Sequence, residues 1–359
     1  MCIRDRYQSI LHEARKLPHF AIHNDLNDYN ILVTSDDHDG VLVSGIIDFG
    51  DMVRSPHVCE LAIACAYIVL DQANPIKIIA NLVAAYHKKN QLKEKDLDLL
   101  FIFLKMRLAV SVINSTMMAK ENPDDPYITI SQGPAWRFLE QEFDPNIVLA
   151  KLRIACGFEV IKNSKRILAY LNKNCGKFSN IFNCDLVHAP MVDLSVFGTV
   201  IPENPFNLTS SEATKIGADI NVDYWLGFWG EPRLIYTSHE FRTGKYNNSN
   251  RRSIHLGIDI FTNSGHKISA PLHGIVRTVE NRKSHLDYGG IVILEHSNNH
   301  GDKFYSLYGH LNPSVVDELS VGQIIEKGEV FCELGSSNNN GGWAPHLHLQ
   351  LSLSLECMD

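Results

Sequence analysis

Two short stretches of sequence decide the fold of the C-terminal half of this chain: His255-Leu256-Gly257-Ile258-Asp259 and, about ninety residues later, Pro345-His346-Leu347-His348. Side chains on a β-strand alternate between its two faces, so residues two or four positions apart share a face. If both stretches are strands, the first presents His255 and Asp259 on one face, and the second presents His346 and His348. Two imidazoles and a carboxylate that face one point predict a zinc site.

The sequence around these motifs has the pattern of a β-rich domain. From about Tyr224 onwards, short apolar runs alternate with turns rich in Gly and Asn, which is typical of strands joined by loops. The expected strands cover residues 268–270, 274–279, 290–296, 304–308, 330–334 and 347–351. We therefore expect this half to be mainly β.

The residue types of the two motifs match a catalytic zinc site. Such a site takes three protein ligands and keeps one position open, and His255, Asp259 and His348 fit that number. Hydrolysis also needs a base and a group that stabilises the oxyanion, and imidazoles serve both purposes near neutral pH. His346, on the same strand face as His348, and His310 are the predicted catalytic groups.

The abundance of histidine here provides a simpler alternative explanation. Nine of the 17 histidines lie between His255 and His348, so a pair of them could come together by composition alone. We apply this explanation to the other five histidines of the region, which we interpret as surface or turn residues: His266, His273, His285, His296 and His300.

Several blocks of this half occur in the order found in one family of peptidases. The blocks are residues 255–260, 270–276, 308–311, 321–328 and 345–348. The arrangement resembles the lysostaphin/LytM-like zinc endopeptidases over roughly residues 224–353. The resemblance implies an antiparallel β-sheet groove with Zn²⁺ at its floor. It also implies cleavage of peptide bonds in short peptides, often those of glycine-rich or cell-wall cross-bridges. Because no export signal is present, a cell-wall substrate is not favoured.

A second constellation lies near the N-terminus, in residues 23–30 and 47–51. Phosphoryl transfer needs a carboxylate near the attacking hydroxyl and oxygen ligands for Mg²⁺. Short strands over 31–33 and 41–43 flank a turn, and this hairpin brings both ends of the constellation together. We predict that Asp25 orients and deprotonates the hydroxyl, and that Asn30 and Asp48 bind the Mg²⁺ that accompanies ATP.

The spacing H-x-D-x-x-x-x-N followed by I-D-F-G-D resembles the aminoglycoside phosphotransferase and choline kinase-like superfamily, and most closely its hydroxylysine kinase branch. The resemblance implies the C-lobe of a kinase. Asn24 occupies a position where Gly is usual in the family, and Glu60 is expected to be a structural acid. Only about twenty residues precede His23, so we expect the nucleotide-binding N-lobe to be missing and this fragment to lack kinase activity.

Apolar residues at helical spacing after Pro56, over 78–86 and over 97–118 predict an α-helical N-terminal half, and a further helix is expected over 146–172. The expected fold class is α+β with two domains. Residues 1–145 form a mainly α-helical kinase-like C-lobe with a catalytic hairpin, 146–223 form a helix and an irregular connector, and 224–359 form a mainly antiparallel β zinc-peptidase domain.

Composition excludes several other classes. The 359 residues are 45% hydrophobic and 21% charged, as in ordinary globular proteins. A net charge of −8 without a basic stripe argues against nucleic acid as a partner. Eight cysteines without a C-x-x-C pair indicate neither a disulfide framework nor a cysteine zinc site. We therefore expect a cytoplasmic protein without a membrane segment.

Taken as a whole, the sequence predicts a fragment of a multidomain enzyme that acts on small-molecule and peptide substrates. It combines a phosphotransferase lobe for an amino alcohol or a hydroxylated amino acid with a zinc-dependent peptide hydrolase. Two alternatives stay open: the zinc domain only positions domains or substrates, or both sites are non-catalytic relics. The combination resembles a multidomain architecture in which a pyridoxal-phosphate aminotransferase domain follows, so we expect both ends of the parent to be missing.

Overall fold

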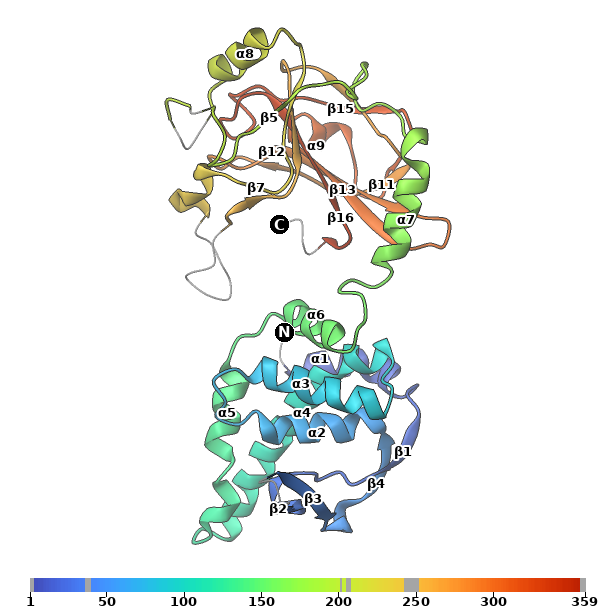
Figure 1. Cartoon of the computed structure of the whole chain (residues 1–359), viewed down its shortest axis with the longest axis vertical. Coiled ribbons are helices and arrows are strands. Elements are labelled where there is room, and N and C mark those ends of the chain that lie inside the picture. Colours follow the sequence, from blue (N-terminus) through green and yellow to red (C-terminus); the bar gives the residue numbers. More distant parts are fainter. Residues whose placement is uncertain (1–2, 36–39, 201, 205–207, 242–251, 356–359) are drawn as a thin grey trace. The chain divides into compact units, whose positions relative to one another are not determined.

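The computed structural model describes residues 3–35, 40–200, 202–204, 208–241 and 252–355. The chain divides into two compact units, Met1–Lys162 and Asn163–Asp359 (Figure 1). The segment 146–223, which we expected to contain a helix and an irregular connector, is divided between the two units at Lys162.

The first unit is built mainly of α-helices, as expected. They are α1 (Ile3–Ala14), α2 (His57–Ile68), α3 (Pro75–Lys89), α4 (Glu94–Glu121), α5 (Gln132–Glu140) and α6 (Pro145–Ala155), with a 3₁₀ turn η3 (Pro126–Thr129). Local sequence sets their ends: Pro75 lies in the first turn of α3, and the Asp144 side chain accepts from two backbone amides at the start of α6. Leu61, Leu100 and Leu152 are buried in the core between the helices.

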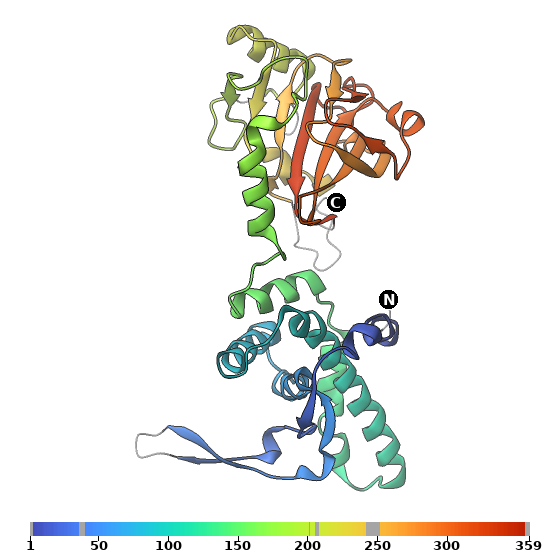
Figure 2. The same cartoon turned by 90° about the vertical axis from the view of Figure 1, so that its right-hand side faces the viewer.

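A β-hairpin and a second strand pair accompany these helices. The pairs are β2 (Ile31–Ser35) with β3 (Val41–Ile46), and β1 (His19–Ile22) with β4 (Val53–Pro56). The hairpin extends away from the helices of its unit (Figure 2). The expected hairpin strands are confirmed, while turn residues 36–39 lie outside the described residues. Two 3₁₀ turns, η1 (Asp28–Asn30) and η2 (Phe49–Asp51), adjoin the open end of the hairpin.

The second unit contains one large, mainly antiparallel sheet, which confirms the expected β architecture. Its strand order within the described residues is β14-β11-β12-β13-β16-β9-β6-β5, and only the β5–β6 pair is parallel. The strands are β5 (Met191–Val192), β6 (Trp225–Gly227), β9 (Ile258–Phe261), β11 (Gly274–Arg282), β12 (Gly289–Ser297), β13 (Lys303–Leu311), β14 (Ile324–Ile325) and β16 (His346–Ser352).

Smaller elements surround this sheet. Two further pairs join β7 (Glu231–Pro232) to β8 (Ile254–His255) and β10 (Lys267–Ser269) to β15 (Val330–Glu333). The remaining elements are α7 (Ser164–Asn174), η4 (Cys175–Lys177), α8 (Ser210–Asp219), η5 (Leu234–Thr237), η6 (His239–Phe241) and α9 (Val315–Glu318).

The single helix expected over 146–172 is wrong, because this stretch forms α6 and α7 with a break between them. Gly157 and Asn163 both have positive φ, of 76° and 65°. A left-handed residue ends an α-helix, and glycine and asparagine adopt that conformation at low cost. The break also contains the boundary between the two units at Lys162.

Alternation along β16 separates the core from the site. Leu347 packs in the main core cluster with Val292, Leu294 and Tyr308, whereas His346 and His348 project from the opposite face. The fully buried apolar side chains thus hold β13 and β16 in place from one side of the sheet. The polar face can therefore present histidines with little freedom to move.

Composition also led to expectations about the cysteines and about membrane-spanning segments. Six cysteines in the described part of the chain are free: Cys59, Cys65, Cys156, Cys175, Cys184 and Cys332. Among the described residues, no helix combines the length and the hydrophobicity needed to cross a bilayer.

Candidate functional site

The three predicted metal ligands come together in the second unit. His255 Nε2 lies 3.1 Å from Asp259 Oδ1, and His348 Nδ1 also lies 3.1 Å from that oxygen. The two imidazole nitrogens are 2.9 Å apart. All three residues are buried, and they form a group of ligand atoms that could hold one metal ion. The residue types at the site therefore match those that bind zinc in proteins.

The strands that carry these ligands differ from those that the alternation of the sequence predicted. His255 and Asp259 do not share one strand, because the stretch divides into β8, which pairs with β7, and β9, which pairs with β16. On β9, Asp259 lies directly opposite His348. The intervening Gly257 is in close contact with the His348 imidazole, since a Cβ at Gly257 would lie 2.5 Å from His348 Cε1. The missing side chain is what allows the two strands to close around the ligands.

A backbone hydrogen bond orients the first ligand. His255 Nδ1 lies 3.1 Å from the Phe228 carbonyl oxygen, and because a carbonyl only accepts, this nitrogen carries the proton. The lone pair of His255 Nε2 is therefore directed at the site, in the manner usual for metal-binding histidines. Burial favours the neutral form of Asp259, but its neighbours, above all His255 and Arg233, outweigh burial and hold the pKa of Asp259 well below its usual range. The side chains present thus suit a divalent cation.

His346 and His310, the predicted catalytic groups, lie beside the ligands. Their ring centroids are 4.2 Å apart, and His346 Nε2 lies 3.6 Å from Asp259 Oδ1. His346 Nδ1 donates to the Ala344 carbonyl at 2.6 Å, and His310 Nδ1 donates to the Asn340 carbonyl at 3.1 Å. In both rings Nε2 is therefore the nitrogen left to accept a proton. Burial lowers the pKa of His346 to about 4 and that of His310 well below its usual range, so both rings are neutral at pH 7.

An irregularity in β13 places His310. Its φ is +62°, which is unusual for a residue other than glycine, and the β12–β13 register shifts between Gly290 and Val292. Such bulges occur frequently next to active sites, where they redirect a side chain. The strained backbone is held by two hydrogen bonds: His310 N donates to Tyr288 O at 2.9 Å, and Gly335 N donates to His310 O at 2.9 Å.

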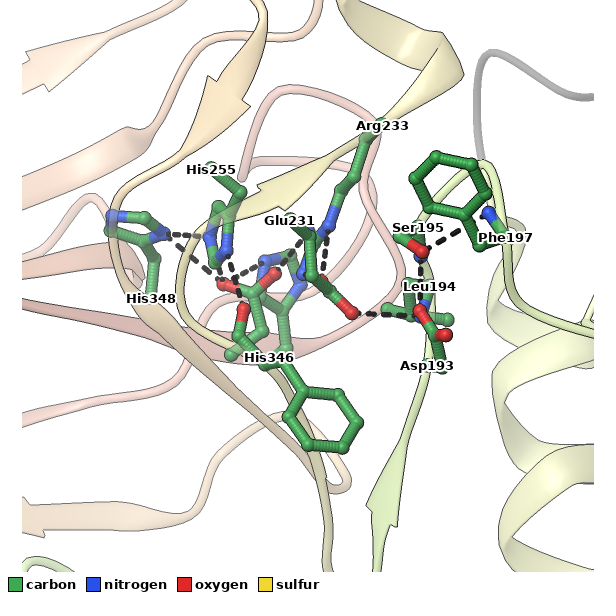
Figure 3. Close-up of polar contacts among 11 residues, drawn as sticks. Asp193, Leu194, Ser195, Phe197, Glu231, Arg233, His255, His346 and His348 are labelled. Atoms are coloured by element: carbon green, nitrogen blue, oxygen red, sulfur yellow. Dashed lines mark hydrogen bonds and ion pairs between the residues drawn. The ribbon is translucent and has the colours of Figure 1, made fainter.

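Two residues that we did not predict, the buried Glu231 and the partly buried Arg233, complete the polar part of the site. Arg233 donates from Nη1 to Asp259 Oδ2 at 2.5 Å, and its Nε donates to Glu231 Oε2 at 2.8 Å (Figure 3). Glu231 lies directly opposite His255 in the β7–β8 pair. Neither residue belongs to a recognisable motif, so only the folded structure reveals them. Tyr288 and Trp343 supply aromatic walls, with ring centroids 5.4 and 5.6 Å from that of His310.

The other histidines of this half only partly match our interpretation. His273, His285 and His300 are exposed, as expected, and His266 is half-buried against Tyr224. For His296 the expectation of a surface or turn position is wrong. It is buried on β12, where its ring bonds with the Ser306 hydroxyl at 2.6 Å and the His273 carbonyl at 2.7 Å, so it acts as a core histidine.

The predicted phosphotransferase residues lie in the first unit, between β1 and η2. Asp25 Oδ1 accepts from Arg107 at 2.6 Å and from the Tyr67 hydroxyl at 3.1 Å. Asn30 Nδ2 donates to the Asp25 carbonyl at 2.8 Å and to its carboxylate at 3.2 Å. The Asn30 side chain thus commits its amide nitrogen to Asp25 and leaves its oxygen for a cation.

Asp48 reaches the same end of the hairpin through its neighbour, because Ile47 N donates to the Asn30 carbonyl at 3.1 Å. The Asp48 carboxylate belongs to an exposed residue with a φ of 65°. Asn24 has a φ of 69°, which explains how asparagine replaces the usual glycine, since asparagine tolerates this conformation. The Glu60 carboxylate accepts from the backbone amides of His23 and Asn24, which supports the structural role expected for it.

A cavity opens beside Asp25. It has a volume of about 840 Å³, and its lining includes Tyr67, Arg107, Met118 and Tyr127 from α2, α4 and η3. The cavity is large enough for a small-molecule ligand, and its lining places a cation and a carboxylate side by side. Arg107 and Tyr67 were not among our predicted site residues, because neither belongs to the loop motif.

The fold and ligand set of the second unit define a metal-dependent hydrolase class, and comparisons with known proteins agree with it. Residues 253–358 match the family model "Peptidase family M23", and residues 3–97 match the model "Phosphotransferase enzyme family". The C-terminal region is therefore an M23 peptidase domain with a His-Asp-His metal site. The N-terminal region belongs to the phosphotransferase family and is hydroxylysine kinase-like.

Individual relatives show the same division. The chain is 34% identical to hydroxylysine kinase of Mus musculus over 137 residues, which is 36% of this chain and 36% of that protein. It is 31% identical to L-Ala–D-Glu endopeptidase of Bacillus subtilis (strain 168) over 132 residues, or 34% of this chain and 37% of that protein. The chain thus spans little more than a third of the curated relatives that it matches. The solved catalytic domain of lysostaphin from Staphylococcus simulans aligns at 22% identity, with a TM-score of 0.25, over 41% of this chain and 88% of that domain.

Proposed function

We propose that the second unit hydrolyses a peptide bond, with zinc held by His255, Asp259 and His348. The observation that carries this proposal is the convergence of the three ligand atoms beside His310 and His346, two neutral imidazoles whose Nε2 atoms can accept a proton. The family match over the same residues supports it.

The chemistry divides between the ion and the side chains. Zinc, when bound, supplies Lewis acidity that polarises a peptide carbonyl and makes water more acidic. His346 Nε2 accepts a proton from the attacking water and passes it to the leaving amine nitrogen. His310, whose ring adjoins His346, would stabilise the negative charge that develops on the carbonyl oxygen once its Nε2 has taken up a proton, because the neutral ring carries its N–H on Nδ1. The two backbone carbonyls that accept from Nδ1 hold both rings in the orientation for these transfers.

A relative of this chain supports the choice of the first substrates to test. That relative is named an L-Ala–D-Glu endopeptidase, so a short peptide with a small residue followed by an acidic one is a suitable first substrate, together with a glycyl peptide. We expect purified protein to contain about one zinc per chain, which is lost in His255→Ala and His348→Ala. An absence of zinc from fresh wild-type protein would contradict the proposal.

Two variants separate catalysis from mere zinc binding. Peptide hydrolysis should survive Asp48→Ala, which changes only the phosphotransferase loop, and should be lost in His346→Ala, which retains all three metal ligands. A zinc-loaded wild-type protein that cleaves neither peptide would favour the alternative function, in which the zinc domain only positions a substrate or another domain.

For the first unit, we infer a phosphotransferase lobe that acts on an amino alcohol or a hydroxylated amino acid. Asp25 would serve as the base, while Asn30 and Asp48 would hold Mg²⁺ with ATP. The 840 Å³ cavity beside Asp25 and the similarity to hydroxylysine kinases support this inference. We expect negligible ATP-dependent phosphorylation of hydroxylysine or choline by this chain alone. Robust turnover that Asp25→Asn abolishes would show that the chain needs no further lobe.

A further inference from the structure

The two carboxylate oxygens of Asp259 have different partners. Oδ1 faces the imidazole nitrogens of His255 and His348, at 3.1 Å from each. Oδ2 instead accepts a hydrogen bond from Arg233 Nη1 at 2.5 Å. The two oxygens of this ligand thus face different partners, Oδ1 towards the imidazoles of the metal site and Oδ2 towards Arg233.

Arg233 is itself held firmly. Its Nε and Nη2 atoms both donate to Glu231 Oε2, and Glu231 Oε1 accepts from the backbone amide of Leu194 at 2.8 Å. The side chains of Arg233, Glu231 and Asp259 are 12%, 4% and 2% exposed. A continuous buried chain of hydrogen bonds thus runs from the backbone next to β5 to the metal ligand.

The geometry of the guanidinium explains why arginine suits this position. Its planar fork can bind two carboxylates at once in a fixed arrangement, whereas a lysine ammonium is a single point charge on a flexible stem. The Glu231 side of the fork fixes the plane of the guanidinium, and the Asp259 side then fixes the rotation of the ligand carboxylate. A carboxylate without such a partner could rotate and offer either or both oxygens.

The net charge of Asp259, Arg233 and Glu231 indicates that Arg233 affects the metal site mainly by orienting Asp259. Arg233 alone would repel a divalent cation, but the buried carboxylate of Glu231 offsets its charge. The three side chains together carry the single negative charge that Asp259 would carry alone. What the pair adds to the site is therefore a preferred direction for Asp259 rather than extra charge.

We propose that Arg233, anchored by Glu231, is a positioning residue that holds Asp259 as a one-oxygen ligand of the zinc site. This inference rests on the zinc site of the proposed function. It extends the site to residues that precede the region matched by the M23 family model, residues 253–358. Ligands oriented by outer partners typically lose about 10–100-fold in metal affinity when the partner is removed.

The test measures zinc affinity of the full chain by competition with a chromogenic chelator. Arg233→Gln removes the charge and the fork, and Arg233→Lys keeps the charge but removes the fork. We expect both variants to bind zinc about 10–100-fold more weakly than wild type. The visible absorption spectrum of the Co²⁺-substituted protein should change in both, because the coordination of Asp259 changes. Arg277→Gln, which breaks the 2.7 Å pair with Glu295 elsewhere in the same sheet, is the matched control and should leave both readouts unchanged.

The outcomes separate this inference from the proposed function. If Arg233→Lys keeps the zinc affinity and Co²⁺ spectrum of wild type, charge alone matters and the positioning role is overturned. Wild-type zinc affinity and Co²⁺ spectrum in Arg233→Gln would also overturn it. Wild-type protein that binds no zinc would instead refute the proposed function. If circular dichroism shows that the Arg233 variants do not fold, Glu231→Gln tests the anchor, because it loosens the fork without touching Asp259. A wild-type Co²⁺ spectrum in that variant would also overturn the inference.

Discussion

At the residue scale, Gly257 shows how tightly the metal site is built. A Cβ at this position would lie 2.5 Å from His348 Cε1 and 2.6 Å from His348 Nε2, closer than non-bonded atoms approach each other. Any side chain must therefore displace the imidazole that supplies one of the three ligands. The glycine in the motif His255–Asp259 thus has a steric role, in addition to the spacing that it provides.

We expect Gly257→Ala to weaken zinc binding by roughly tenfold or more, because the His348 ring must move to make room. Titration of zinc against a chelator would measure the change. Gly176→Ala is a matched control in the same unit, since a Cβ there would meet nothing within 4 Å. Equal zinc affinities for the Gly257 variant and wild type would show that the ring can shift without loss of the ligand.

At the element scale, an ion pair ties α7 to the turn between β12 and β13. Arg166 on α7 donates to both carboxylate oxygens of Asp302, and Asn298 Nδ2 donates to the same carboxylate at 2.8 Å. These bonds lower the pKa of Asp302 from 3.8 to about 2, and the hydrogen bond from Arg166 contributes most to this shift. The helix that opens the second unit is thus fixed to its sheet through a charged turn.

This pair predicts a pH dependence of stability. Because the pKa of Asp302 is lower in the folded state, its contribution is fully present above about pH 4 and is lost as the pH falls towards 2. The difference in urea midpoint between wild type and Asp302→Asn should be largest at neutral pH and should shrink between pH 4 and 2. Arg166→Gln should show the same trend. A difference that stays constant with pH would mean that the carboxylate gains nothing from its charge.

At the scale of the whole molecule, metal binding should be coupled to the stability of the second unit. The ligands come from β8, β9 and β16, which are brought together only by folding. A metal that binds the folded state alone stabilises it, by about 2.7 kcal/mol when the free metal concentration is 100 times Kd.

We therefore expect zinc to raise the temperature of the thermal transition that reports the β-sheet signal, and a chelator to lower it. Circular dichroism with and without zinc would measure this shift. His348→Ala serves as the control, because it lacks one ligand and should respond little to zinc. A shift of equal size in that variant would place the stabilising ion elsewhere in the chain.

The sequence by itself determined both families, the mainly helical and mainly β halves, and the ligand set. These features depend on local patterns: strand alternation places His346 and His348 on one face, and the spacing from Asp25 to Asn30 is contained in one loop. The tertiary structure alone decided the division of the first metal motif into β8 and β9 and the burial of His296. It also decided the partnership of Arg233 and Glu231 with Asp259. These outcomes depend on contacts between segments far apart in the chain, which no local pattern of residues encodes.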